Sequence, residues 1–325
     1  MKKSTKIIIA VVAVLTVMFC ALAVALGFVI NHYLSPDAEE TTVSDVHTTI
    51  LTEQEQTATA PVVDPDSIEW DNSLSFGEDD GLINILFIGQ DRREGEGRQR
   101  SDAMILCSLN PETNELSMIS FMRDIYVQIP GYEDNRLNAA YAYGGFDLLK
   151  ETLSLNFDVS VDCCVEVDFE GFKTMVDTVG GVDVELTATE AEIVGGGATE
   201  GVCHLDGAQT LTYVRIRKTD SDFMRTQRQR NVLKALFEKM KSLDSTQLLT
   251  FAATLLPLAS TDVEQETLMM LAMQYAASID DMEISSYRIP ADGAYTNATV
   301  REMAVLIPDL SENKKHIFEE YLPLN

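Results

Sequence analysis

Arginine is the residue type whose placement most suggests chemistry in this sequence. The chain has 13 arginines, and eleven of them fall in two windows, the first with Arg92, Arg93, Arg98, Arg100, Arg123 and Arg136 and the second with Arg215, Arg217, Arg225, Arg228 and Arg230. The planar guanidinium can bind two phosphate oxygens at once, which a lysine ammonium does not. Because the whole chain carries 24 Lys+Arg against 52 Asp+Glu, this clustering predicts an anion site on an otherwise repelling surface. For Arg228 and Arg230 the alternative, a solvated helix charge, stays open.

The spacing of these arginines indicates that several of them converge. A predicted strand over Leu211–Arg217 places Arg215 and Arg217 on one face, because side chains alternate along a strand. In the predicted helix that follows, Arg225 and Gln229 are four residues apart and are therefore neighbours on one helix face. We expect the two windows to form one phosphate-binding pocket.

Two aspartates accompany the arginines. Asp91 follows a predicted buried strand, Asp102 precedes the next strand, and Arg123 stands directly after a third. That last position is where ligands bind in open α/β sheets. The carboxylates can form plain ion pairs, or they can hold Mg²⁺, which takes one or two carboxylates plus substrate phosphates. Enzymes of phosphoryl transfer commonly bind the phosphates with Mg²⁺ and arginines together, so these residues predict binding of a polyphosphate or pyrophosphate.

The elements that must position these side chains alternate between strands and helices from Gly81 onward. Strands are predicted at Leu82–Gly89, Ala103–Leu109, Leu116–Phe121, Val159–Phe169, Val182–Leu186, Leu211–Arg217 and Met282–Arg288. Helices are predicted at Asn138–Phe157 with an interruption at Gly144-Gly145, and at Glu170–Val179, Arg225–Lys241, Gln247–Leu256, Glu264–Ile279 and Thr299–Leu310. This alternation predicts an α/β fold with a mixed central sheet covered by helices on both faces.

The first 80 residues differ from the rest. Residues 7–30 carry no charge and follow three lysines, and as a helix they would be about 36 Å long, enough to cross a bilayer. The lysines place residues 1–6 in the cytoplasm and the remainder outside. A cleaved signal peptide is the alternative, although its apolar region is normally shorter. Residues 31–80 are polar and predict a flexible extracytoplasmic linker. Packing of Ile68–Phe76 onto the domain at 81–325 stays open.

Composition excludes several classes of function. A net charge of −28 argues against nucleic-acid binding, which depends on Lys and Arg. Four histidines, five cysteines without a CxxC pair, and the absence of GxSxG and HExxH leave little support for a zinc site or a serine or cysteine nucleophile. Cys163 and Cys164 are expected on opposite faces of a strand, and both disulfides and buried thiols stay open for Cys107, Cys163, Cys164 and Cys203.

Longer motifs resemble a known family. The strings are LFIGQDRR, RSDAMILCSLN, SMISFMRDIYVQIPG, RLNAAYAYGG, GFKTMVDTVGGVDVEL, LDGAQTLTYVRIRKTDSDFMRTQRQRNVL and IPADGAY. In this order they are similar to the LytR-CpsA-Psr family over about Gly81–Pro323. The resemblance implies a membrane-anchored phosphotransferase that moves a glycopolymer, such as wall teichoic acid or capsule, from undecaprenyl pyrophosphate onto the 6-hydroxyl of peptidoglycan N-acetylmuramic acid. It also implies an apolar lipid pocket, for which the helix after Arg225 and the Leu248–Leu258 segment are candidate walls.

The resemblance also implies roles for individual residues. It assigns the ligands of Mg²⁺, with Mn²⁺ as the alternative ion, to Asp91 and Asp102, and a further functional carboxylate to Asp222. It assigns pyrophosphate binding to Arg100, Arg123, Arg215, Arg217, Arg225 and Gln229. Catalysis is then expected from Asp91, Asp102, Arg123 and Asp222, with one aspartate accepting the acceptor's proton. Phe121-Met122 departs from the Ile-Pro common in the family, and Arg136 replaces a frequent lysine.

Two other functions fit the same residues. One is a pyrophosphate hydrolase acting on lipid-linked intermediates, which an acceptor-dependent product would exclude. The other is a non-catalytic envelope or regulatory protein that binds lipid. A binding protein without activity would be expected to have lost Asp91 or the arginines, and the chain retains them.

Overall fold

The computed structural model describes residues 60–71, 74–76, 81–90, 100–216, 222–244, 246–248, 259–264 and 282–324. The predicted membrane segment, most of the predicted linker, Asp91, Arg217 and nearly all of the predicted helices at Gln247–Leu256 and Glu264–Ile279 lie outside these residues. Within the described ranges, no helix has both the length and the apolar character needed to cross a bilayer.

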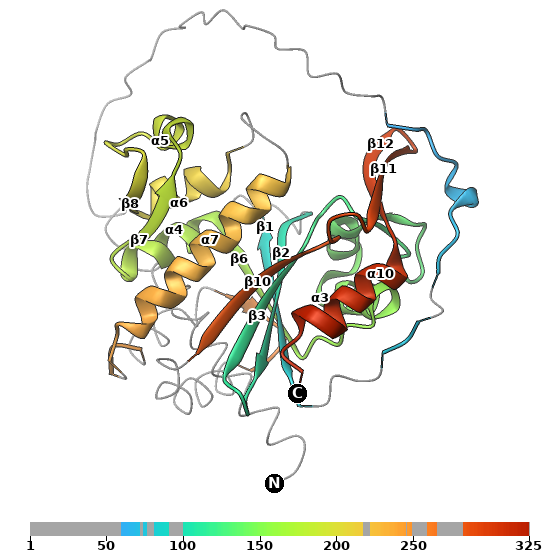
Figure 1. Ribbon diagram of the computed structural model, residues 1–325, viewed down its shortest axis with the longest axis horizontal. Coiled ribbons are helices and arrows are strands. Elements are labelled where there is room, and N and C mark those ends of the chain that lie inside the picture. The colour runs from blue at the N-terminus through green and yellow to red at the C-terminus, as the bar shows by residue number, and fades with distance from the viewer. Residues whose placement is uncertain are drawn as a thin grey trace, which may run out of the picture.

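A six-stranded mixed sheet forms the centre of the domain (Figure 1). In spatial order its strands are β10 (Glu283–Ile289), β3 (Glu115–Phe121), β2 (Ser101–Asn110), β1 (Ile83–Gln90), β6 (Cys163–Asp168) and β9 (Ser260–Thr261). β1 is parallel to β6 and β10 is parallel to β3, whereas the β1–β2, β2–β3 and β6–β9 pairs are antiparallel. The predicted mixed sheet is therefore confirmed.

Helices cover both faces of this sheet, as predicted. On one side lie α4 (Phe169–Thr178), α6 (Gly207–Val214) and α7 (Asp222–Lys241), and on the other lie α3 (Leu137–Phe157) and α10 (Leu310–Lys315) (Figure 1). The smaller elements are η1 (Pro65–Ser67), β4 (Tyr126–Val127), β5 (Asn135–Arg136), β7 (Val182–Leu186), α5 (Ala188–Val194), β8 (Gly201–Leu205), β11 (Tyr295–Val300), β12 (Met303–Pro308) and the π-helical turn η4 (His316–Tyr321).

The sheet separates two apolar cores because neighbouring side chains on a strand point to opposite faces. In β1, Ile85 packs into the core beneath α4, α6 and α7, whereas Leu86 packs into the core beneath α3. Cys163 and Cys164 divide in the same way, which confirms their predicted opposite orientation. All four described cysteines are free thiols. Burial raises the pKa of the Cys163 thiol to about 12, so this thiol stays protonated and inert.

α3 is interrupted where the glycine pair predicts it. Gly145 has φ 71° and ψ −145°, outside the helical region, and it joins two helical segments across a kink. A residue with a Cβ is strained at this φ, so glycine is needed here. The kink lies between the N-terminal turn, which contacts Arg123, and the buried segment that ends at Phe157.

One strand prediction is wrong. Leu211–Arg217 alternates like a strand, but Gly207–Val214 forms the helix α6. Asp206 and Gln209 make a capping box at its start. Their side chains accept hydrogen bonds from backbone N–H groups of the first turn, which have no carbonyl partner within the helix. The helix ends at Arg215, whose backbone N–H bonds to Thr212 and Tyr213 carbonyls. Arg215 therefore lies at a helix end and not on a strand face.

The predicted final helix at Thr299–Leu310 is also wrong. β11 and β12 form an antiparallel hairpin there, in which Tyr295 pairs with Pro308 and Val300 with Met303. The two turn residues, Arg301 and Glu302, have φ of 47° and 63°, which matches the twist of a two-residue hairpin turn and excludes a continuous helix. The helix that follows, α10, starts only at Leu310.

The folded domain begins earlier than predicted. Val62 bridges Thr299 in β11, the Trp70 ring stacks on Tyr126 at 6.1 Å, and the Phe76 ring stacks on Phe318 at 4.8 Å. Trp70 and Phe76 thus have their burial partners in the domain, which the local polar composition hides, whereas the Val62 side chain is exposed and only its backbone bridges β11. The boundary at residue 80 is thus too late, and the alternative of packing by Ile68–Phe76 is the correct one.

Candidate active site

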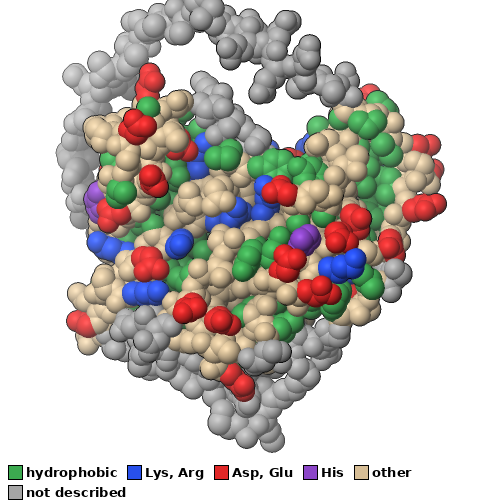
Figure 2. Space-filling model, in the orientation of Figure 1, with side chains coloured by type: hydrophobic (Ala, Val, Ile, Leu, Met, Phe, Trp, Pro, Cys, Tyr) green, Lys and Arg blue, Asp and Glu red, His purple; other side chains and the backbone are tan. Residues whose placement is uncertain are grey.

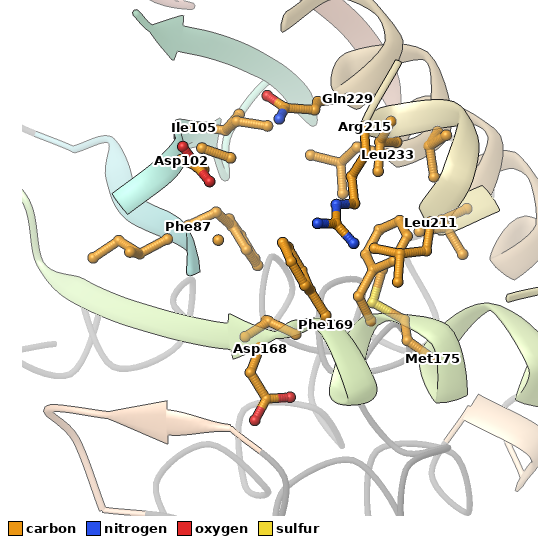
Figure 3. Close-up of a pocket in the computed structure, with 18 of the residues that line it drawn as sticks. Phe87, Asp102, Ile105, Asp168, Phe169, Met175, Leu211, Arg215, Gln229 and Leu233 are labelled. Carbon is orange, nitrogen blue, oxygen red and sulfur yellow. The ribbon is translucent and has the colours of Figure 1, made fainter. Parts of the chain in front are cut away.

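A pocket opens between the sheet and the helices α4, α6 and α7 (Figure 3). Its empty volume, including the open mouth, is about 950 Å³. Most of its wall is apolar and is formed by Phe87, Ile88, Ala103, Ile105, Val167, Phe169, Phe172, Met175, Leu211, Val214, Val232, Leu233 and Leu236. Charged and polar side chains, namely Asp102, Asp168, Arg215, Arg225 and Gln229, also line it. The pocket therefore joins an apolar compartment to cationic and polar groups.

α7 supplies one wall because its buried residues recur at helical spacing. Gln229, Val232, Leu233 and Leu236 lie at i, i+3, i+4 and i+7 and all line the pocket. The helix after Arg225 is one of the two candidate walls of the predicted lipid pocket, and it lines the apolar part of the pocket described here. Only Leu248 of the second predicted wall has a described side chain, and it packs in the core on this side of the sheet.

Asp102 and Arg123 form an ion pair at the start of β2. Arg123 NH1 donates to Asp102 Oδ1 at 2.7 Å, and each side chain is 23% exposed. Arg123 lies two residues after the end of β3, and Asp124 Oδ2 lies 3.5 Å from its Nε. The first turn of α3 is tied to the same place, because Asn138 N donates to the Arg123 carbonyl at 3.3 Å. An ion pair, one of the two alternatives that the sequence left open for the aspartates, is thus present at Asp102.

Arg215 reaches the pocket from the end of α6. Its guanidinium carbon lies 4.3 Å from the centroid of the Phe169 ring, the first residue of α4. This cation–π contact holds the guanidinium at the pocket wall. Figure 3 shows the guanidinium pointing into the cavity, with Asp102 and Gln229 facing the same space from other sides.

The structure brings together part of the predicted set. Asp102, Arg215, Arg225 and Gln229 line one pocket, and Arg123 contacts Asp102. Arg100 is exposed and lies two residues before Asp102. Asp91 and Arg217 lie outside the described residues, and of Asp222 only the backbone is described, as the first residue of α7. For these three the predicted roles stay predictions.

Arg228 has a structural contact that its sequence position did not indicate. Its guanidinium is 2% exposed, and Nε donates to Glu190 Oε1 at 2.6 Å while NH1 donates to the Ile216 carbonyl at 3.2 Å. Burial alone raises the pKa of Glu190, but hydrogen bonds from Thr187 and Arg228 outweigh it and lower the pKa below its ordinary value. Arg228 therefore holds α7 against α5 and the end of α6, and the solvated-charge alternative does not apply to it.

Sequence reasoning missed the wall from α4. Phe169, Phe172 and Met175 line the pocket at i, i+3 and i+6. The signal was present as an apolar stripe on a short helix, but the same stripe is expected of any helix that packs on a sheet. Only the position of α4 across the pocket from α7 distinguishes the two cases.

The model of the LytR_cpsA_psr family matches residues 39–318. The chain belongs to the LytR-CpsA-Psr family. Its sequence is 36% identical over 247 residues to the polyisoprenyl-teichoic acid–peptidoglycan teichoic acid transferase TagU of Oceanobacillus iheyensis, covering 71% of this chain and 75% of the relative.

Solved structures share the fold. TagT bound to LI-WTA superposes with a TM-score of 0.60 at 28% identity, covering 76% of this chain and 94% of TagT. The family protein YwtF (TagT) with bound octaprenyl pyrophosphate lipid superposes with a TM-score of 0.55 at 25% identity, covering 76% and 93%. Family membership and the α/β domain with its six-stranded mixed sheet are therefore established.

The described part of the chain contains no group of three or more His, Cys, Asp or Glu side chains placed to hold a metal ion. Asp102 offers carboxylate oxygens beside the pocket, and its predicted partner Asp91 lies outside the described residues. Carboxylate oxygens are ligands that Mg²⁺ prefers, and one or two suffice when substrate phosphates complete the shell.

Proposed function

We propose that this protein transfers teichoic acid from a polyisoprenyl pyrophosphate carrier to peptidoglycan. The observation that carries the proposal is the pocket itself, an apolar compartment that continues into a group of arginines beside Asp102. A polyisoprenyl pyrophosphate has the matching form, with a hydrocarbon chain attached to a doubly phosphorylated end. The transferase activity of TagU and the lipid pyrophosphate bound to TagT support the same reading.

Each described side chain has a part in this reaction. Arg215, Arg225 and Gln229 bind the pyrophosphate oxygens as it enters from the apolar side. Arg123, oriented by its bond to Asp102, neutralises charge on the phosphorus that is attacked. The apolar walls contributed by Phe87, Ile105, Phe172, Leu211 and Leu233 take the isoprenoid chain and exclude water from it.

The transfer step exchanges one phosphorus–oxygen bond for another. The hydroxyl oxygen of the acceptor sugar bonds to the phosphorus that carries the polymer. The bond from that phosphorus to the bridging oxygen breaks, and polyisoprenyl phosphate leaves. The hydroxyl proton passes to a carboxylate of the site, for which Asp91, Asp102 and Asp222 are the candidates. Asp222 is the first residue of α7 and precedes Arg225 by three positions, which supports a role for it at the phosphate that Arg225 binds.

We propose that the site uses Mg²⁺, with Mn²⁺ as a substitute. Asp102 would hold it, together with Asp91 and phosphate oxygens of the substrate. When bound, the ion supplies positive charge that offsets the charge of the two phosphates. We further propose that residues 7–30 anchor the protein in the cell membrane and that the domain faces outward, where its acceptor lies.

The test is a transfer assay with the full-length protein, a purified lipid-linked teichoic acid donor and peptidoglycan. Arg225→Gln and Arg123→Gln should each lower kcat by about 10²–10³, the usual cost of removing one donor to a developing charge. The control is Arg301→Gln. Arg301 lies on the β11–β12 turn, away from the pocket, and its NH1 pairs with Glu133 Oε2 at 2.9 Å. Full activity of Arg225→Gln, or lipid phosphate release that does not need peptidoglycan, would contradict a transferase that works through this pocket.

A further inference from the structure

α7 buries two arginines besides the one that lines the pocket, and their surroundings differ. Arg228 is matched by Glu190, as described above. Arg230 is 5% exposed, and its only hydrogen bond among the described residues is from NH2 to Gln227 Oε1 on the same helix. Its Nε and NH1 are buried and have no hydrogen-bond partner in the described structure. Two strong donors of a buried guanidinium are thus left open, which is rare in folded proteins.

Arg230 faces a different side of α7 from the pocket. It comes five residues after Arg225, which places it about 140° around the helix and about 7.5 Å along the axis. Two contacts, one near each end of α7, show which side of the helix faces β10. Lys241 Nζ donates to the Met282 carbonyl before β10, and the Phe223 ring lies under the Arg288 guanidinium near the end of β10. Residues 223, 230 and 241 recur at helical spacing, so Arg230 lies on this side, between the two contacts.

A second guanidinium completes the site. Arg288 lies 4.2 Å above the Phe223 ring, and its charge acts on Arg230. Its own partners are the Pro290 carbonyl at 3.2 Å and the carboxylate of Asp292, a side chain that is 93% exposed. Ser120 pairs with Arg288 across the β10–β3 register, on the same face of the sheet, and its buried Oγ has no hydrogen-bond partner either.

The free energy of this arrangement is unfavourable without an anion. Burial and the repulsion from Arg288 lower the pKa of Arg230 to about 10, so the guanidinium is still charged at neutral pH. A buried charge without a counter-charge destabilises a fold, and two like charges add to that cost. An oxyanion between the two guanidiniums removes both penalties and accepts the open donors. Figure 2 shows Lys and Arg side chains gathered in the middle of the face over α7 and β10.

We propose that Arg230 and Arg288, with Ser120, form a second oxyanion site on the side of α7 that faces β10, away from the Arg225 side that lines the pyrophosphate pocket. Its ligand is a phosphate or carboxylate of one of the two substrates, an assignment that rests on the proposed function. Two sources have this chemistry. One is a phosphodiester of the transferred polymer, and the other is the carboxylate of the muramic acid acceptor.

The site is tested by anion binding, without any transfer reaction. The full-length protein carries Arg225→Gln to weaken the pyrophosphate pocket, and glycerol 3-phosphate or N-acetylmuramic acid is titrated in. In this background Arg230→Met should raise the dissociation constant at least tenfold for one of the two probes. The probe that is affected identifies the source. Arg301→Gln is the control and should leave both constants unchanged. Unchanged dissociation constants for both probes in Arg230→Met would refute the proposed site. Because the titration involves no transfer reaction, a protein that fails to transfer polymer still gives a valid result here.

Stability without anion gives an independent readout. Arg230→Met keeps the apolar stem and removes a charge that has no counter-charge, so its Tm should rise by about 3 °C in an anion-free buffer. The matched variant Arg228→Met removes a paired guanidinium from the same helix and should lower Tm. A drop in Tm for Arg230→Met comparable with that of Arg228→Met would mean that Arg230 is a structural residue. Arg288→Met, tested by the same titration, keeps the proposal falsifiable if Arg230→Met does not fold.

Discussion

The buried ion pair between Arg228 and Glu190 allows a quantitative prediction. The two side chains are 2% and 10% exposed, and their N–O distance is 2.6 Å. Removing one partner leaves the other as an uncompensated buried charge, which costs about 3–5 kcal/mol. Arg228→Met also removes the donor to the Ile216 carbonyl, so the upper end of this range is expected for that variant. Glu190→Gln keeps an oxygen that can accept from Thr187 N and should cost about 3 kcal/mol.

The double variant separates the ion pair from other contacts. When both charges are removed, neither is left buried alone, so Arg228→Met with Glu190→Gln should cost about 2 kcal/mol or more less than the sum of the single variants. Urea unfolding of the four proteins at pH 7 measures this coupling. Strict additivity would show that the two groups do not stabilise the fold through each other.

The same pair positions the active site, and this gives a second readout. Ile216 directly follows Arg215, and Arg228 lies between Arg225 and Gln229 on α7. Loss of the contact should therefore lower kcat about tenfold or more even in protein that is fully folded at the assay temperature, because misplaced groups bind a transition state less well. Wild-type kcat in a destabilised Arg228→Met would refute the positioning role.

Two further predictions concern pH and the pocket. Since the folded-state pKa of Glu190 lies below its ordinary value of 4.5, its stabilising effect is fully present above that value and is lost as pH falls through the folded-state pKa. The Tm difference between wild type and Glu190→Gln should thus shrink between pH 7 and pH 3, and a constant difference would contradict the pKa shift. Leu233→Trp fills the apolar compartment and should raise the KM for the polyisoprenyl donor about tenfold at unchanged peptidoglycan KM. Val202→Trp, at a side chain that is 76% exposed, is the matched control, and equal donor KM in both variants would mean that the lipid binds elsewhere.

Residue chemistry alone indicated which side chains come together. The clustering of arginines on an acidic chain predicted an anion site, and Arg215, Arg225 and Gln229 line one pocket with Asp102, which Arg123 contacts. The strands β1, β2 and β3 followed from short apolar runs, because a strand buried on both faces leaves no other pattern. These features depend on side-chain type and local spacing, which a single sequence carries in full.

Other features depended on contacts between distant parts of the chain. The segment Leu211–Val214 has a strand-like pattern, yet the capping box at Asp206 and the packing of Tyr213 make it helical. Arg215 consequently reaches the pocket from a helix end rather than from a strand face. Trp70 and Phe76 lie in a polar stretch whose burial partners, Tyr126 and Phe318, are far away in sequence.

The arginines of α7 show most clearly which features follow from local sequence and which follow from contacts with distant parts of the chain. The sequence by itself determined that the helix carries several guanidiniums and that Arg225 and Gln229 share a face. Only the tertiary structure decided that Arg225 lines the pocket, that Arg228 binds Glu190, and that Arg230 is buried near Arg288 without an acceptor for two of its donors. Helical spacing sets the direction of each side chain relative to its neighbours, but the charge it meets belongs to elements packed there by the rest of the chain.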